Sequence, residues 1–123
     1  GEGTAIITES CVLNPNRNPG VSKSDVEETL FRLLGLSKII WLPGIAGKDI
    51  TDGHTDFYAR FATPGVVVAH HDPDPKSHDH AVTSKHLEIL NSACDAKGRQ
   101  LQVHVLSAPN FDKLRWKGEL EDF

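Results

Sequence analysis

The first forty residues alternate between extended and helical hydrophobic patterns. Thr4 to Thr8 and Cys11 to Leu13 are β-branched or apolar, and Asn14-Pro15-Asn16 interrupts them. This pattern predicts strand material that ends in a turn. The nearly continuous apolar run Lys38 to Leu42, placed before Pro43-Gly44, predicts a second strand that is buried on both faces.

A helix is predicted between these two strands. Ser22 or Ser24 can cap its start, and the acidic residues that follow suit the positive end of a helix. Gly35 is a typical helix end. The apolar positions recur at helical spacing: Val26, Leu30, Phe31, Leu33 and Leu34. The first unit of the chain is therefore predicted as strand, helix, strand.

The middle of the chain predicts a loop and a hairpin. Residues 44–56 are rich in Gly, Asp and Thr and have no hydrophobic periodicity, so we expect a loop. Phe57 to Phe61 and Val66 to Ala69 are predicted strands. Ala62-Thr63-Pro64-Gly65 joins them as a turn, because Pro presets one turn dihedral and Gly admits a positive φ.

The second unit is completed by a helix and a strand. Residues 70–80 are polar and broken by prolines, and a helical stripe then runs from Val82 to Leu90 with a stop at Lys97-Gly98. Leu101 to Leu106 alternates apolar and polar residues and predicts a strand. The order is strand, strand, helix, strand. The charged tail from Phe111 to Phe123, with its aromatic pair Phe111 and Trp116, predicts a connector or the start of another element.

Two successive units of similar order, each about 45 to 50 residues long, predict an internal structural repeat. We place the units at about 1–43 and 56–107, with a connector at 108–123. Repeat units need neighbours to bury their faces. The chain also contains no methionine. We therefore expect an internal piece of a longer protein, with the remaining units of the parent chain as its partners.

Composition narrows the classes of partner. The 123 residues are 38% hydrophobic and 24% charged, which is ordinary for a globular domain. The net charge of -4, the pI near 5.9 and the lack of a basic block argue against nucleic acid or an anionic membrane. No apolar run approaches the roughly 20 residues that span a bilayer. We expect a soluble, cytoplasmic protein, and a homo-oligomer remains open.

Candidate chemistry is concentrated in the loop Asp49-Ile50-Thr51-Asp52-Gly53-His54-Thr55-Asp56. His54 and Asp56 are two positions apart just before a predicted strand, so on an extended chain they share one face. An imidazole that transfers protons and a carboxylate that holds a cation can act on one small substrate. From the spacing alone, a polar loop with an Asp turn cap and a surface histidine is the competing interpretation.

Histidines and aspartates also gather between residues 70 and 80, and these are ligand types for zinc or other divalent ions. A metal site requires them to converge, whereas the interleaved Pro73 and Pro75 favour a solvated loop. We therefore predict no metal there. The residues of this segment are His70, His71, Asp72, Asp74, His78, Asp79 and His80.

Neither cysteine is expected to be reactive. Cys11 and Cys94 are far apart and form no C-x-x-C pair, so zinc-ribbon and thioredoxin-type sites are not supported. No base stands near Cys11 in the sequence, and Cys94 falls on the inner part of the second predicted helix, so we expect buried, inert thiols. Arg17 lies in a turn of Asn and Pro residues, where we expect its guanidinium to brace the turn.

An ordered series of short motifs runs along residues 1–106. It starts with Gly-Glu-Gly-Thr at residues 1–4 and includes Gly53-His-Thr-Asp56, the Gly-His-x-Asp element. The other motifs are Thr-Glu-Ser-Cys-Val-Leu-Asn-Pro-Asn-Arg-Asn-Pro at residues 8–19, Ile-Trp-Leu-Pro at 40–43, Thr-Pro-Gly-Val-Val at 63–67 and Asp-Ala-Lys-Gly-Arg at 95–99. Each motif alone is a weak signal, but the ordered set is specific and resembles agmatine deiminases and bacterial peptidylarginine deiminases.

This resemblance implies the pentein fold, a five-bladed α/β propeller built of strand-strand-helix-strand units, of which the chain would supply about two. It implies a C-N hydrolase that converts agmatine or peptidyl-arginine to a ureido product and ammonia through a cysteine-thiouronium intermediate. His54 would be the general acid and base, and Asp56 would hold the substrate guanidinium. The resemblance implies no metal and no other cofactor.

The chain departs from the family pattern at several points. The family nucleophile stands in a glycine-rich segment near the C-terminus, and neither Cys11 nor Cys94 has that context, so we expect the nucleophile outside this chain. Glu2 does not match the upstream family carboxylates, and Phe57-Tyr58 stands where many relatives carry Asn. Two alternatives stay open: a non-catalytic fragment or pseudoenzyme with a structural or binding role, and a metal hydrolase that uses the 70–80 histidine segment.

Overall fold

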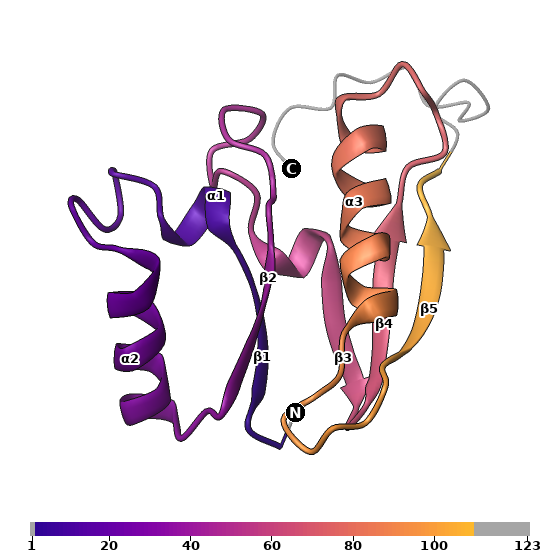
Figure 1. Cartoon of the computed structure of the whole chain (residues 1–123). Helices are drawn as coiled ribbons and strands as arrows, with labels where there is room; N and C mark the ends of the chain where they lie inside the picture. Colours follow the sequence, from indigo (N-terminus) through magenta and orange to yellow (C-terminus); the bar gives the residue numbers. More distant parts are fainter. Residues whose placement is uncertain (1, 110–123) are drawn as a thin grey trace.

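Two small sheets organise residues 2–109, the part of the chain that the computed structural model describes (Figure 1). The first sheet pairs β1 (Thr4–Thr8) with β2 (Lys38–Leu42) in parallel, from Thr4 opposite Lys38 to Thr8 opposite Leu42. The strands predicted at Thr4 to Thr8 and Lys38 to Leu42 are therefore confirmed. Burial along β2 is partial, because only Ile40 and Leu42 are buried, so the prediction of a strand buried on both faces was wrong.

Helix α2 (Lys23–Leu34) connects the two strands, as predicted from its apolar spacing. Ser22 caps it through a capping box, in which the Ser22 side chain accepts from the backbone N–H of Asp25 and the Asp25 side chain accepts from the backbone N–H of Ser22. Gly35 ends the helix in the left-handed conformation, with φ 62°. These start and stop signals act within one helical turn, which is why the sequence reveals them.

Cys11 to Leu13 do not continue the first strand, so that prediction was wrong. Glu9–Val12 forms the single helical turn α1, closed by the backbone N–H of Leu13, which donates to the carbonyl of Glu9 at 2.9 Å. The pairing of β1 with β2 stops at Thr8 and Leu42. Past that point the backbone N–H of Ser10 still donates to the carbonyl of Pro43 at 3.0 Å, and the helical turn satisfies the backbone N–H of Leu13 locally.

The second sheet has the strand order β3-β4-β5, and helix α3 covers one of its faces (Figure 1). Strands β3 (Ala59–Thr63) and β4 (Val66–His71) are antiparallel, whereas β4 and β5 (Gln102–Ser107) are parallel. The hairpin predicted at residues 62–65 is confirmed, with Thr63 paired to Val66 and Gly65 at φ 77°. Helix α3 (His78–Ser92) runs between β4 and β5 in the chain.

The start of the first strand and the end of the helix in this half differ from the predictions. Phe57 and Tyr58 precede the strand, because Thr55–Phe57 forms the short 3-10 helix η1. Helix α3 ends at Ser92 and does not reach Lys97-Gly98. The Asp95 carboxylate accepts the backbone N–H groups of Lys97 and Arg99 and holds a tight turn there. Cys94 therefore lies beyond the helix, in a bridge to Gln100.

One hydrophobic core joins both sheets. It combines side chains from β1 and β2 with others from β3, β4 and α3, and α3 contacts β2 as well as β4 and β5. On β5, Val105 and Leu106 are 48% and 62% exposed. The buried core residues are Ile6, Ile40, Leu42, Ala59, Val67, Ala69, Leu90 and Leu101.

Among residues 2–109, no helix is both long and apolar enough to span a bilayer. The predicted connector tail and its aromatic pair, Phe111 and Trp116, lie outside the described residues.

Candidate functional site

The loop after β2 folds back onto the end of β1, at the upper end of the molecule in Figure 1. Thr8 Oγ1 donates to the carbonyl of Gly53 at 2.6 Å, and Ser10 Oγ donates to the carbonyl of Asp52 at 2.7 Å. Asn14 Nδ2 donates to Asp52 Oδ2 at 2.7 Å. Three side chains from the first fifteen residues therefore hold the loop that precedes His54.

Hydrogen bonds within the loop add to these contacts. The Asp49 carboxylate accepts from the backbone N–H groups of Thr51 at 2.6 Å and Gly53 at 3.1 Å, and from the Thr51 hydroxyl. Burial raises the pKa of Asp49, but these hydrogen bonds outweigh it and hold the pKa below its ordinary value. The Asp49 carboxylate is therefore charged, and it holds the loop through these hydrogen bonds.

The backbone conformation and the close neighbours at residue 53 favour glycine. Its φ of 81° lies in the left-handed region, and a Cβ there would stand 3.1 Å from the carbonyl oxygen of Ile45 and 3.1 Å from Ser10 Oγ. The residue before it, Asp52, also has a positive φ of 58°. Two consecutive left-handed residues turn the chain sharply just before His54.

His54 and Asp56 lie on the same side of the chain, although not for the predicted reason. Asp56 is part of η1, which His54 precedes as its N-cap, so the chain here turns and is not extended. The turn leaves Nδ1 of His54 4.0 Å from Oδ1 of Asp56, which is within ion-pair distance but too long for a hydrogen bond. Their side chains are 38% and 51% exposed. Both groups are therefore accessible to a small molecule.

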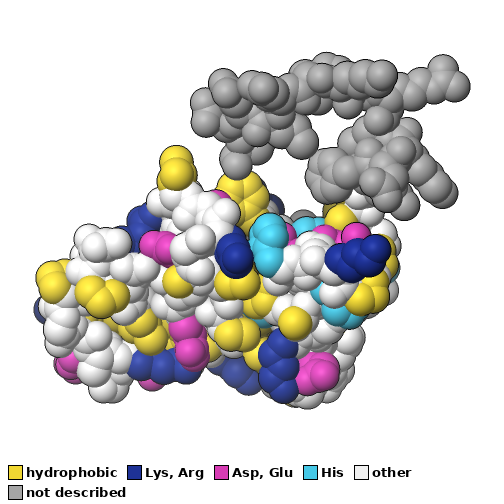
Figure 2. Space-filling model, turned by 90° about the horizontal axis from the view of Figure 1, so that it is seen from above, with side chains coloured by type: hydrophobic (Ala, Val, Ile, Leu, Met, Phe, Trp, Pro, Cys, Tyr) yellow, Lys and Arg dark blue, Asp and Glu magenta, His cyan; other side chains and the backbone are white. Residues whose placement is uncertain are grey.

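The other ring nitrogen of His54 has a basic neighbour. Nη2 of Arg17 lies 2.9 Å from Nε2 of His54. The prediction assigned Arg17 to bracing its own turn, and its motif of alternating Asn and Pro carried no sign of this contact. The view from above in Figure 2 shows histidine, acidic and basic side chains reaching the surface at this end of the molecule.

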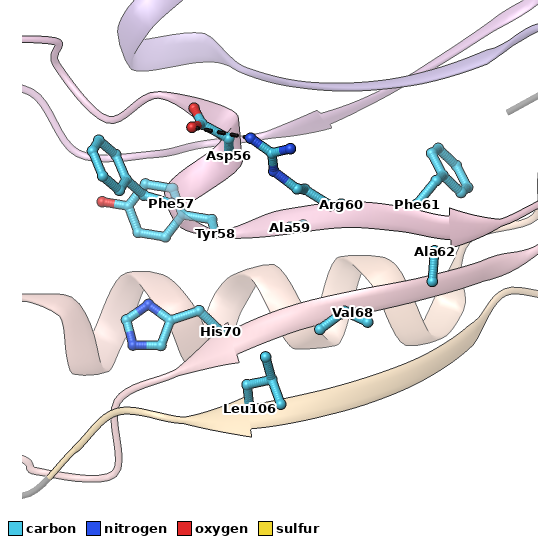
Figure 3. A pocket seen from close by; sticks show the side chains of 10 residues that line it. All are labelled: Asp56, Phe57, Tyr58, Ala59, Arg60, Phe61, Ala62, Val68, His70 and Leu106. Atoms are coloured by element: carbon cyan, nitrogen blue, oxygen red, sulfur yellow. Dashed lines mark hydrogen bonds and ion pairs between the residues drawn. The ribbon is translucent and has the colours of Figure 1, made fainter.

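Asp56 stands at the rim of a depression of about 370 Å³ (Figure 3). Nη2 of Arg60 lies 3.3 Å from Oδ2 of Asp56, so this carboxylate already holds one guanidinium group. His54 is not among the lining residues. The depression is mostly apolar and is lined by Asp56, Phe57, Tyr58, Ala59, Arg60, Phe61, Ala62, Val68, His70 and Leu106.

The histidine segment at residues 70–80 does not assemble a metal site. His80 Nδ1 lies 2.8 Å from the carbonyl oxygen of Asp72, and His71 Nε2 lies 3.3 Å from Ser84 Oγ. The ring of His70 stacks on Tyr58, with centroids 6.5 Å apart. In the stretch from residue 2 to residue 109, no three His, Cys, Asp or Glu side chains are grouped so that they could hold a metal ion.

The environment of Cys11 does not favour a thiolate. Cys11 is 7% exposed, and burial raises the pKa of its thiol, which is opposite to the shift that activates a nucleophile. Cys94 is partly exposed, and its thiol donates to Oε1 of Gln100 at 3.8 Å. Cys11 is thus buried as predicted, whereas the expectation that Cys94 is buried was wrong.

His86 is a structural histidine whose role the sequence did not indicate. It is fully buried, and its Nε2 accepts a hydrogen bond from the backbone N–H of Gly44 at 3.0 Å. The ring of Tyr58 meets it edge-on, with centroids 4.8 Å apart. Burial lowers the pKa of His86 to about 4, so the ring is neutral. In the sequence it was one member of an apolar helical stripe.

Comparison with known proteins identifies a consistent group of relatives. The sequence model of the Porphyromonas-type peptidyl-arginine deiminase family matches residues 1–121. The agmatine deiminase of Pseudomonas fluorescens is 40% identical over 109 residues, which cover 89% of this chain and 30% of that protein. The chain spans about a third of the length of the curated relatives it matches.

Solved structures of the same group superpose on the chain. The agmatine deiminase of Enterococcus faecalis matches with a TM-score of 0.82 and 37% identity, over 87% of this chain and 29% of that one. A C. jejuni agmatine deiminase described with substrate bound matches with a TM-score of 0.75 and 30% identity, over 89% and 32%. The chain therefore has the pentein-type α/β fold of these structures.

Proposed function

Because the chain belongs to the Porphyromonas-type peptidyl-arginine deiminase family, we propose that it forms part of an enzyme that hydrolyses a guanidinium group. The substrate class is agmatine or arginine within peptides, and the products are the ureido compound and ammonia. The observation that carries the proposal is the pair formed by Nδ1 of His54 and Oδ1 of Asp56, 4.0 Å apart and accessible on an anchored loop. Since the chain spans about a third of its relatives, the proposal concerns the intact protein that contains these residues.

In this proposal Asp56 holds the substrate guanidinium. Carboxylates and guanidinium groups form charge-assisted, directional hydrogen bonds, which orient a planar cation as well as bind it. The contact between Asp56 and Arg60 supports the assignment, because the Asp56 carboxylate already accepts a hydrogen bond from a guanidinium group and both residues line the depression. The substrate would replace Arg60 at this carboxylate.

His54 transfers protons in the proposed reaction. A thiolate adds to the guanidinium carbon, the C–N bond to the departing nitrogen breaks, and His54 donates the proton that this nitrogen needs to leave as ammonia. Water then adds to the thiouronium carbon, His54 takes a proton from it, and the C–S bond breaks to return the thiolate. The thiolate comes from outside residues 2–109 in this scheme, because Cys11 is buried with a raised pKa.

We also propose that the chain contains two repeat units of a pentein domain, at about 1–43 and 56–107, followed by a connector at 108–123. The element order β3-β4-α3-β5 supports the second unit, and the parallel pair β1 and β2 around α2 supports the first. Cys11 and Cys94 are free thiols, which suits a reducing compartment, so the proposed enzyme acts in the cytoplasm.

The test is turnover by the intact protein. It is incubated with agmatine and, separately, with a peptide that contains arginine, and both ammonia and the ureido product are measured. Equal amounts of the two products from one of these substrates are expected. If neither substrate yields ureido product, the alternative of a non-catalytic protein with a binding or structural role replaces the proposal.

A further inference from the structure

The depression beside the candidate site has one acidic group, and that group lies at its rim. Asp56 is the only acidic residue among those that line it (Figure 3). The hydroxyl of Tyr58 is engaged elsewhere, because it donates to Oδ1 of Asp79 at 3.2 Å. The volume of about 370 Å³ falls within the range of small-molecule pockets, roughly 300 to 1,000 Å³. The depression therefore offers one anionic anchor beside a surface for apolar contact.

An apolar wall extends from this anchor across the second sheet. Arg60 of β3 is paired with Val68 of β4, and His70 of β4 is paired with Leu106 of β5; all four residues line the depression. A methylene chain that leaves Asp56 along this wall would be withdrawn from water, which stabilises its binding. The apolar lining residues are Phe57, Ala59, Phe61, Ala62, Val68 and Leu106.

Phe57 follows Asp56 directly in η1 and places an aromatic ring beside the same depression (Figure 3). The backbone N–H of Phe57 donates to the carbonyl of His54 at 3.1 Å, which closes the turn that contains Asp56. Phe57 is 51% exposed, so in the described structure its ring is accessible to a ligand. One short turn therefore presents a carboxylate and an aromatic ring to the same depression.

The side chain of Arg60 has the chemistry of the expected ligand. It is an aliphatic stem that ends in a guanidinium group, it lines the depression, and its Nη2 lies 3.3 Å from Oδ2 of Asp56. Figure 3 shows this contact reaching from β3 towards η1. The Arg60 side chain is 71% exposed, so an incoming guanidinium can displace it. A guanidinium group on an aliphatic stem therefore fits between the apolar wall and Asp56.

The two carboxylate oxygens of Asp56 face different neighbours. Oδ1 lies 4.0 Å from Nδ1 of His54, whereas Oδ2 faces Arg60. His54 is not among the residues that line the depression. In the proposed function His54 must reach the nitrogen that leaves as ammonia, which is a terminal nitrogen of the guanidinium. The terminal nitrogens therefore face His54, and the stem of the substrate points away from His54 into the depression.

We propose that the depression is a subsite for the aliphatic stem of the guanidine substrate and that Phe57 is a specificity-determining residue, whose ring packs against the methylene groups next to the guanidinium. This subsite rests on the proposed function for the position of the guanidinium at Asp56. The ligand class is an alkylguanidine, the group that agmatine and arginine in peptides share. Affinity at the subsite comes from the burial of methylene groups, so it depends on the length of the stem.

The first test measures binding as a function of stem length. Methyl-, ethyl-, propyl- and butylguanidine are titrated into the intact protein, and their Kd values are determined by NMR. Each added methylene is expected to lower the Kd by up to about 3- to 4-fold in the unmodified protein. In Phe57→Asn, which replaces the ring with a short polar group, the gain per methylene should fall to less than about 2-fold. A Kd that does not depend on stem length in the unmodified protein, or an equal gain in both proteins, overturns the proposal.

Three comparisons separate contact with the stem from a change in the shape of the turn. Methylguanidine has almost no stem, so its Kd should be the same in Phe57→Asn and in the unmodified protein; weaker binding of methylguanidine would mean that Phe57 only shapes η1 and would contradict the proposal. Phe57→Leu keeps an apolar side chain and should keep most of the gain per methylene. Leu33→Asn removes an apolar residue that is 67% exposed on α2, and it should leave every Kd unchanged.

Turnover keeps the subsite apart from the proposed function. KM is measured for agmatine and for an arginine-containing peptide in the unmodified protein and in Phe57→Asn, and the substrate whose KM rises in the variant is the one whose stem occupies the subsite. An unchanged KM for both substrates contradicts the subsite. If the alkylguanidines bind with the expected dependence on stem length and neither substrate yields ureido product, only the proposed function fails. If a substrate is turned over and Kd does not depend on stem length, only the subsite fails.

Discussion

The backbone N–H of Gly44 donates to Nε2 of His86 at 3.0 Å, and this contact joins the start of the loop that carries His54 to helix α3. Gly44 has a φ of 63°, and a Cβ at this position would collide with Ser10 Oγ. His86 accepts the bond only while Nε2 is unprotonated. The position of the loop that leads to His54 therefore depends on the charge of a buried histidine.

Folding stability is expected to fall on acidification because of His86. Its pKa is about 4 in the folded protein and 6.5 in an exposed histidine, so its contribution is complete above pH 6.5 and is lost as the pH falls through 4. This pKa difference corresponds to a contribution of about 3 kcal/mol to the free energy of unfolding. The free energy of unfolding is measured with urea for the intact protein and for His86→Leu at pH 7, 5.5 and 4. The difference in free energy of unfolding between the unmodified protein and His86→Leu should shrink steadily as the pH falls.

The control for this prediction is His104→Leu, which removes an exposed histidine from β5. The difference between this variant and the unmodified protein should stay constant over the same range. A His86→Leu difference that does not change with pH would show that burial of the His86 ring does not control acid stability.

Gly53→Ala is expected to destabilise the loop more than Gly47→Ala. Both glycines have a positive φ, 81° and 73°, so both substitutions carry backbone strain of about 1 kcal/mol. Only at Gly53 would the new Cβ meet other atoms, because nothing lies within 4 Å of it at Gly47. Melting temperatures of the two variants give the comparison. An equal decrease in melting temperature for both variants would mean that the atoms around residue 53 move to accommodate the new Cβ without loss of stability.

Substitutions of His54 and Asp56 are expected to affect different kinetic constants. His54→Ala should lower kcat by at least about 100-fold, because general acid–base catalysis contributes that much or more. Asp56→Asn should mainly raise KM, by roughly 10- to 100-fold, since it removes the charge from a hydrogen-bonded partner of the guanidinium. Steady-state kinetics of the intact enzyme with its better substrate measure both. Near-normal constants for the two variants would remove both residues from the mechanism.

Arg60→Gln is expected to improve substrate binding. Arg60 and Asp56 form an exposed pair, with side chains 71% and 51% exposed, and such pairs contribute up to about 1 kcal/mol. Removal of this competitor should lower KM by up to about fivefold and leave kcat unchanged. Lys85→Gln, which breaks a similar exposed pair with Glu88, serves as the control. A higher KM in Arg60→Gln would indicate that Arg60 helps to hold the substrate.

The elements of the fold were largely predictable because their signals are local. Helix α2 follows from the capping residues around Ser22 and the stop at Gly35, and the hairpin follows from its Pro-Gly turn. The errors occur where tertiary contacts override local preference. Cys11 lies in a helical turn because the sheet has no further strand to pair with it, and Asp56 lies in a 3-10 turn because the preceding loop is folded back on β1.

The chemical identity of the candidate site is therefore a property of the sequence, in which Gly53, His54 and Asp56 stand together within four positions. Tertiary structure alone decided which groups surround them. Arg17 reaches His54 across 37 residues, and His86 reaches Gly44 across 42. Periodicity and capping act over one or two turns of chain, whereas these contacts arise when two sheets and α3 pack around one core, so no local pattern encodes them.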